Sequence, residues 1–171
     1  AYVEGILNTP TTVIFEEDNP DLSIMSNPTS TRVPDDGIGY EVQSLTGYSQ
    51  ATSYVTLPTR SINNLNDITY LFYTAYSAST CMDFGVRGGM YSWVTSFTPV
   101  KNPKDDGVAI GKNDGDRVYF NISVESDGWL RCKIVDANNF SNELCNVLYQ
   151  MTGVKKDGMV FNKQISLCNN Y

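Results

Sequence analysis

The stretch RVYFNISVESDGWLRCKI, residues 117–134, decides the fold. Apolar side chains stand at every second position on both sides of a central Asp-Gly pair, as Val118, Phe120, Ile122 and Val124 and then as Leu130, Cys132 and Ile134. A period of two is typical of a β-strand with one buried face. Asp127-Gly128 suits a tight turn, because glycine tolerates positive φ. The stretch therefore predicts two antiparallel strands joined by a hairpin turn.

The same pattern extends along the chain. Asp-Gly recurs at Asp36-Gly37, Asp106-Gly107, Asp114-Gly115 and Asp157-Gly158. Further short runs rich in Val, Ile, Thr, Tyr and Phe predict strands over residues 2–7, 11–15, 38–45, 53–57, 68–75, 91–97, 143–151 and 159–167. Only residues 142–150 could instead form a helical turn or two. We predict one all-β domain over residues 1–171, a two-sheet antiparallel β-sandwich or jelly roll with less than about a tenth of its residues in helices.

A second hairpin is predicted in CMDFGVRGGMYSW, residues 81–93. It contains Asp-Phe-Gly, which binds magnesium in protein kinases, but a kinase also needs a His-Arg-Asp loop and this chain has no histidine. Met82, Phe84 and Val86 alternate with polar or small residues, so Asp83 should point away from the buried side of a strand.

Size and charge limit the function. A chain of 171 residues is long enough to form its own core, which predicts a monomer. The net charge of −7 argues against nucleic acid, which requires a basic face, and against anionic membranes. No apolar run approaches the roughly 20 residues of a membrane helix, so no membrane insertion is expected.

Four cysteines occur at wide spacing, without the CxxC pairs or histidines of a zinc site. An even cysteine count with few lysines predicts a secreted, extracellular protein with disulfides. The start Ala-Tyr-Val would suit a chain whose signal peptide has been removed. We expect the pair Cys145–Cys168 and a second pair, Cys81–Cys132; the alternative is four buried free thiols.

Acidic clusters offer two kinds of site. EEDNPD places Glu16, Asp18 and Asp21 in an arrangement similar to the Glu-x-Asp-x-x-Glu of jelly-roll glycosidases, but Asn19-Pro20 favours a turn there, so no catalytic residue is assigned. KNDGD, with Asn113, Asp114 and Asp116, and the acidic turns at Asp35 and Asp105 are rich in oxygen ligands. They suit a structural calcium ion, whose ligands remain unassigned; no other cofactor is expected.

Outward-facing aromatic and polar residues predict the ligand site. Asp83, Arg87, Tyr119, Trp129 and Arg131 each stand opposite a mostly apolar row. If their strands were neighbours, they would line one groove, in which Tyr119 and Trp129 stack on sugar rings. The prediction is thus an extracellular protein that binds carbohydrate or another extracellular polymer. The alternatives are a glycosidase or polysaccharide lyase, and a structural or protein-interaction module in which the aromatics are ordinary cross-strand pairs.

Residues 68–99, ITYLFYTAYSASTCMDFGVRGGMYSWVTSFTP, carry a family resemblance. A Tyr-rich strand precedes Asp-x-Gly, a turn, a tryptophan and a proline, at the positions Tyr73, Tyr76, Asp83, Gly85, Trp93 and Pro99. This segment resembles concanavalin A-like lectin and glucanase jelly rolls and, more narrowly, YrpD-like secreted bacterial proteins. The resemblance implies a two-sheet jelly roll with a concave face, and it contains no catalytic motif.

Overall fold

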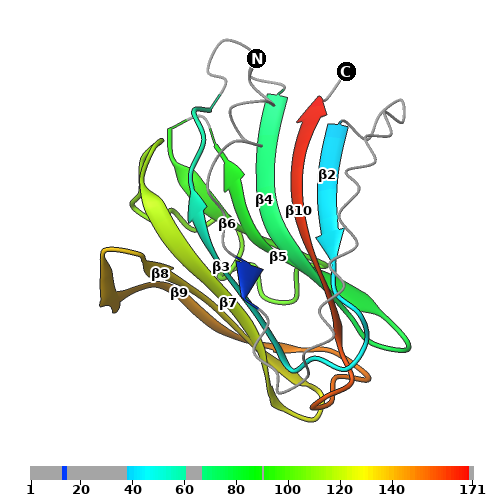
Figure 1. Cartoon of the computed structure of the whole chain (residues 1–171). Helices are drawn as coiled ribbons and strands as arrows, with labels where there is room; N and C mark the ends of the chain where they lie inside the picture. Colours follow the sequence, from blue (N-terminus) through cyan, green and yellow to red (C-terminus); the bar gives the residue numbers. More distant parts are fainter. Residues whose placement is uncertain (1–12, 15–37, 61–66, 90, 170–171) are drawn as a thin grey trace.

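A computed structural model describes residues 13–14, 38–60, 67–89 and 91–169. Sheet A consists, in spatial order, of β1 (Val13–Ile14), β3 (Gln50–Thr56), β7 (Arg117–Ser126), β8 (Trp129–Asp136) and β9 (Asn139–Gln150). Sheet B consists of β2 (Ile38–Gln43), β10 (Val160–Asn169), β4 (Asp67–Tyr76), β5 (Cys81–Gly88) and β6 (Trp93–Thr98). All strand pairs are antiparallel, and the described residues contain no helix. The all-β, two-sheet prediction is confirmed (Figure 1).

The hairpin over residues 117–134 forms as β7 and β8. Its inward row is almost completely buried, with Val118, Ile122 and Leu130 at 0% exposure. Gly128 has φ +80°, the positive value that the Asp-Gly turn requires. Burying each large apolar side chain contributes on the order of 2 kcal/mol, so this alternating row is a main source of stability.

The second predicted hairpin forms as β5 and β6. Met82, Phe84 and Val86 are at most 1% exposed, whereas Asp83 is half-buried on the opposite face. The Phe84 ring lies 5.2 Å from that of Phe97 in the same sheet and 6.1 Å from that of Phe120 in sheet A. The Phe84–Phe120 contact therefore joins the two sheets within the core.

Some predicted elements differ from the structure or lie outside it. Residues 142–150 belong to β9, so the helical alternative is wrong. Of residues 11–15 only Val13–Ile14 are described, and residues 2–7, the motif of Glu16, Asp18 and Asp21, and the turn at Asp35, Asp36 and Gly37 lie outside the described residues. The β-sandwich that the family resemblance implied is present, whereas the narrower kinship with concanavalin A-like or YrpD-like proteins remains a prediction. No helix in the described part of the chain is long and apolar enough to cross a membrane.

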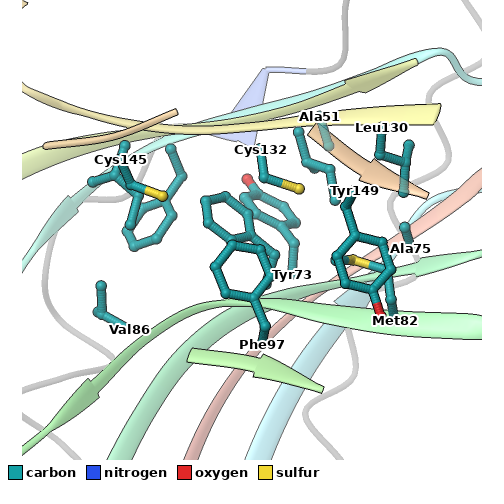
Figure 2. Close-up of a cluster of buried hydrophobic side chains, with 14 of the residues drawn as sticks. Ala51, Tyr73, Ala75, Met82, Val86, Phe97, Leu130, Cys132, Cys145 and Tyr149 are labelled. Carbon is teal, nitrogen blue, oxygen red and sulfur yellow. The ribbon is translucent and has the colours of Figure 1, made fainter. Parts of the chain in front are cut away.

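The prediction of two disulfides is wrong, because Cys81, Cys132 and Cys145 are free thiols. Cys81 is exposed on sheet B, whereas Cys132 and Cys145 lie in the core on the adjacent strands β8 and β9 (Figure 2). The pair Cys81–Cys132 is therefore absent. Cys145 is free, so the pair Cys145–Cys168 is absent as well; the Cys168 side chain itself is outside what the structure describes. Alternation predicts whether a cysteine side chain points into the core, but it does not predict which strand packs opposite that side chain.

The three thiols should differ sharply in reactivity. Burial raises the pKa of Cys145 to about 12 and that of Cys132 above its ordinary value, so neither forms the reactive thiolate at neutral pH. We expect iodoacetamide to label Cys81 in the native protein, and to label Cys132 and Cys145 only after urea unfolding. Peptide mapping by mass spectrometry checks this, with Cys81→Ser as the control. Native labelling of Cys132 would contradict the packing.

Candidate active site on the outer face of sheet B

The outer face of sheet B is polar and concave. β4 and β10 bow toward sheet A, so the face turned away from the core is the hollow side (Figure 1). Alternation along β10 turns Phe161 inward and places Asn162 and Gln164 on the outer face. Asn162 and its β4 partner Thr74 are nevertheless only 1% and 3% exposed. The centre of this face is therefore a buried polar layer, which is costly unless its groups are hydrogen-bonded.

Glu41 on β2 is the acidic centre of that layer. Its Oε2 atom accepts a hydrogen bond from Asn162 Nδ2 at 2.8 Å and another from Gln164 Nε2 at 3.3 Å. The register explains the contacts, because Glu41 lies directly opposite Gln164 and diagonally to Asn162. Glu41 itself is exposed, so the carboxylate is oriented by two amides and remains accessible to solvent.

Asn162 leaves one acceptor without a partner. Its Oδ1 atom is buried and makes no hydrogen bond in the described structure. Buried acceptors are usually satisfied, so this atom is a ready partner for an N–H group of a ligand. The amide nitrogen beside it donates to Glu41.

Tyr76 and Asp83 extend the polar layer across β4 and β5. Burial raises the pKa of Tyr76, and a hydrogen bond with Asn162 only partly offsets this, so the phenol stays protonated and can donate a hydrogen bond. Burial likewise raises the pKa of Asp83, against the opposing effect of a 2.7 Å hydrogen bond from Thr74 Oγ1. The strands β10 and β4 lie between Glu41 on β2 and Asp83 on β5. Because neighbouring strands are about 4.8 Å apart, the two carboxyl groups are too far apart to act on one bond.

The five residues predicted to line one groove lie on two different sheets. Asp83 and Arg87 are on β5 of sheet B, whereas Tyr119, Trp129 and Arg131 are on β7 and β8 of sheet A. The single groove is therefore wrong, because alternation shows which face of a strand is outward but not which strands are neighbours.

Several of these side chains already have protein partners. Arg87 forms an ion pair with Asp106 at 3.0 Å. Burial alone would raise the pKa of Asp106, but hydrogen bonds from Arg87 and from Phe97 N outweigh this effect and lower the pKa. The Tyr119 ring lies 5.1 Å from Phe140. Arg131 pairs with Glu125.

Trp129 is 37% exposed and lies beside a pocket of about 160 Å³ on the sheet A edge.

The residues that sequence reasoning missed are Glu41, Asn162, Gln164 and Tyr76. A signal was present, because Asn162 and Gln164 alternate with Phe161 and Ile165 in a predicted strand. Amides at alternate positions do not by themselves distinguish a binding layer from an ordinary polar surface. The two amides orient a carboxylate only because Glu41 lies on the neighbouring strand β2. That strand is more than a hundred residues away in sequence.

A cleft at one end of the sandwich does not include Glu41 among its lining residues. It has a volume of about 600 Å³ and is lined by Cys81, Pro99 and Lys101 on one side and by Tyr149, Met151 and Thr152 on the other. Cys81 is the cross-strand partner of Tyr76, so the cleft begins at the Tyr76 end of the polar layer. The cleft is walled by both sheets, whereas the Glu41 carboxylate lies on the outer face of sheet B.

The oxygen-rich turns are occupied by protein donors. Asp114, which the calcium prediction included, accepts hydrogen bonds from Arg60 and Trp93. Within the described ranges, no group of three or more Asp, Glu, His or Cys side chains could hold a metal ion. The structural calcium ion remains an untested prediction.

The sequence matches no protein-family model and no curated protein. Two solved structures share its fold. One is SCP-B, a member of the eqolisin family of peptidases, in a complex with the tripeptide Ala-Ile-His, with TM-score 0.52 and 9% identity over 76% of this chain and 63% of that one. The other is scytalido-glutamic peptidase with a transition state analog inhibitor, with TM-score 0.50 and 12% identity over 80% of this chain and 66% of that one.

The chain spans just under two thirds of the length of each peptidase, and at these identities the likeness establishes a shared β-sandwich fold. It also corrects the functional prediction from sequence. A carbohydrate-binding protein was expected, whereas the two solved structures described above are peptidases.

Proposed function

We propose that this chain is a peptide hydrolase in which Glu41 is the catalytic base. The observation that carries the proposal is the Glu41 carboxylate, exposed and oriented by the Asn162 and Gln164 amides. The sandwich that it shares with a glutamic peptidase and an eqolisin supports the same reaction class. The proposal includes an extracellular location, which now rests on composition alone. Disulfides no longer support it, because three of the cysteines are free thiols.

The geometry assigns a role to each group. Glu41 takes a proton from a water molecule, which attacks the carbonyl carbon of the scissile peptide bond. The Gln164 amide, which lies at 3.3 Å from the carboxylate, donates to the oxyanion that develops on the carbonyl oxygen. Glu41 then returns this proton to the nitrogen of the scissile bond as the C–N bond breaks, and Tyr76, whose raised pKa keeps its phenol protonated, donates a hydrogen bond to the departing amine. The cleft beyond Tyr76, of about 600 Å³, has room for substrate side chains.

Replacing the base should abolish hydrolysis. We expect Glu41→Gln to lower kcat/KM by about 100-fold or more, because the amide cannot accept the proton of the attacking water. Cleavage of a mixed peptide library, followed by mass spectrometry from about pH 3 to about pH 8, gives the readout. Glu143→Gln is the matched control, since Glu143 is an exposed glutamate on sheet A that pairs with Lys133. Full activity in Glu41→Gln, or no cleavage by the wild type, would reject the proposal.

The two supporting groups should affect turnover more than binding. We expect Gln164→Ala to lower kcat by about 10- to 100-fold with little change in KM, because the oxyanion contact strengthens in the transition state. Tyr76→Phe should lower kcat as well, and most for substrates with poor leaving groups. Steady-state kinetics check both. A rise in KM with unchanged kcat would mean that these residues only bind substrate.

A further inference from the structure

Two hollows at one end of the sandwich share a wall. The cleft of about 600 Å³ and the pocket of about 160 Å³ beside Trp129 are both lined by Lys101, Tyr149 and Gln150. The cleft lies between the start of β5 in sheet B and the end of β9 in sheet A, and the pocket continues along β9 toward Trp129. Because of these shared residues, the two hollows form one trough, which we call the end trough.

The shared wall is fixed by contacts within the protein. Tyr149 is 4% exposed, its ring stacks on that of Phe97 at 6.0 Å, and its hydroxyl donates a hydrogen bond to the Pro99 carbonyl oxygen at 2.7 Å. Figure 2 shows both rings between the sheets. Met151 N donates to Gly128 O at 3.0 Å, and both residues also line the cleft. The end trough is therefore preformed, as ligand sites usually are.

Lys101 supplies the positive charge of the end trough. Among the described residues, no Asp, Glu or Arg lines the cleft, and burial raises the pKa of Tyr149 to about 12, so its phenol stays neutral. The pocket contains one carboxylate, Asp105, which accepts a hydrogen bond from Asn102 Nδ2 at 3.0 Å. No ion pair in the described part of the chain involves Lys101. Its charge is therefore free to pair with a ligand.

Apolar and aromatic side chains lie on both sides of Lys101. They are Pro99, Tyr149 and Met151 in the cleft and Phe97, Trp129 and Val147 in the pocket. Trp129 is 37% exposed, so part of its indole is open to a ligand. A ligand that joins an apolar body to one negative charge matches this lining, because the body leaves water while the charge pairs with the ammonium.

We propose that the end trough binds an amphipathic carboxylate, whose carboxylate group pairs with Lys101 and whose apolar body packs against Tyr149 and Trp129. Two sources share this chemistry: a medium-chain fatty acid and the free C-terminus of a short apolar peptide. A hollow of about 600 Å³ is in the range that takes small organic ligands. Glu41 lines neither hollow, so this inference goes beyond the proposed peptidase and can be tested without its activity.

Tryptophan fluorescence can follow binding directly. The chain has two tryptophans, and Trp93 is completely buried, so a ligand in the end trough should change the emission of Trp129. We would titrate the Glu41→Gln variant near neutral pH with decanoate and with the dipeptide N-acetyl-Leu-Phe, each against its neutral amide. We expect a saturable change, and binding at least about 10-fold tighter for the acid than for its amide, because the acid forms a charge-assisted hydrogen bond.

The two acids distinguish the two sources. Saturation by decanoate alone would identify a fatty acid, and saturation by N-acetyl-Leu-Phe alone would identify a peptide C-terminus. If neither acid gives saturable binding, or if the acids bind no tighter than their amides, the proposal is wrong. Loss of peptidase activity in Glu41→Gln does not affect this outcome, so the two proposals fail separately.

Two lysine variants locate the charge. Lys101→Met should weaken binding of the acid by about 10-fold and leave binding of the amide unchanged. Lys104→Met is the matched control, since Lys104 is an exposed lysine of the same loop that lines neither hollow, and it should bind as the parent does. Equal affinities for the acid in the two variants would overturn the role of Lys101.

The thiol of Cys81 supplies a second readout. Cys81 is exposed and lines the cleft, so a bound ligand should slow its alkylation by iodoacetamide. We expect saturating acid to protect Cys81 in the parent and in Lys104→Met, and the same concentration to protect it less in Lys101→Met. Peptide mapping by mass spectrometry measures the rate. Unchanged alkylation at saturating ligand would place the ligand outside the cleft and contradict the proposal.

Discussion

Gly85→Ala should unfold the protein or leave it barely folded. Gly85 lies at the middle of β5, opposite Phe72 on β4 and Ser96 on β6. A Cβ atom there would lie 2.0 Å from the Leu71 carbonyl oxygen and 2.5 Å from Phe72 Cα. Both are backbone atoms, so no side-chain rotation can relieve the clash. Only separation of β4 from β5 could, which would disrupt the hydrogen bonding of sheet B.

The expected cost is more than about 4 kcal/mol, a large share of the roughly 5–15 kcal/mol by which domains are stable. Urea unfolding followed by circular dichroism measures it. Gly158→Ala is the matched control, because its added Cβ would meet the flexible Lys155 side chain at 3.1 Å. We expect that variant to change stability by less than about 1 kcal/mol. Equal urea midpoints for Gly85→Ala and the wild type would show that the β4–β5 spacing is wrong.

Asp114→Ala should cause the second large loss of stability. One carboxylate connects three donors: Oδ1 accepts from Arg60 Nε at 2.6 Å and from Trp93 Nε1 at 2.9 Å, and Oδ2 accepts from Arg60 N at 3.0 Å. Trp93 is completely buried, so its indole N–H would lose its partner without gaining water. Burial alone would raise the Asp114 pKa, but these hydrogen bonds outweigh it and lower the value.

We expect Asp114→Ala to cost about 3 kcal/mol, because an unsatisfied buried donor and a broken, partly buried ion pair add together. Asp114→Asn, which keeps an acceptor oxygen, should lose less. Asp116→Ala is the control, since Asp116 Oδ2 accepts only a local, exposed hydrogen bond from Asn113 N, and it should cost about 1 kcal/mol or less. The lowered pKa also predicts that the Asp114 contribution is present near neutral pH and is lost as pH falls through that pKa.

The alternation of residues 117–134 predicted β7, β8 and their buried row, because one buried face imposes a period of two on any strand. The same alternation placed Asp83 outward correctly. It could not show that β5 and β8 belong to different sheets, because sheet membership depends on pairings between distant strands. A correct prediction of the ligand site, of the cysteine pairing and of the polar layer around Glu41 would have required knowing which strands are neighbours.

The position of β10 has a consequence for how the chain acquires its structure. Residues 160–169 lie between β2 and β4, and β2 has no other strand partner among the described residues. During synthesis, β2 therefore cannot pair with its partner strand until more than a hundred later residues have been made. Such distant pairings slow folding and leave strand edges exposed meanwhile. We expect folding to be limited by the arrival of this strand, so nascent chains halted before residue 160 should depend on chaperones.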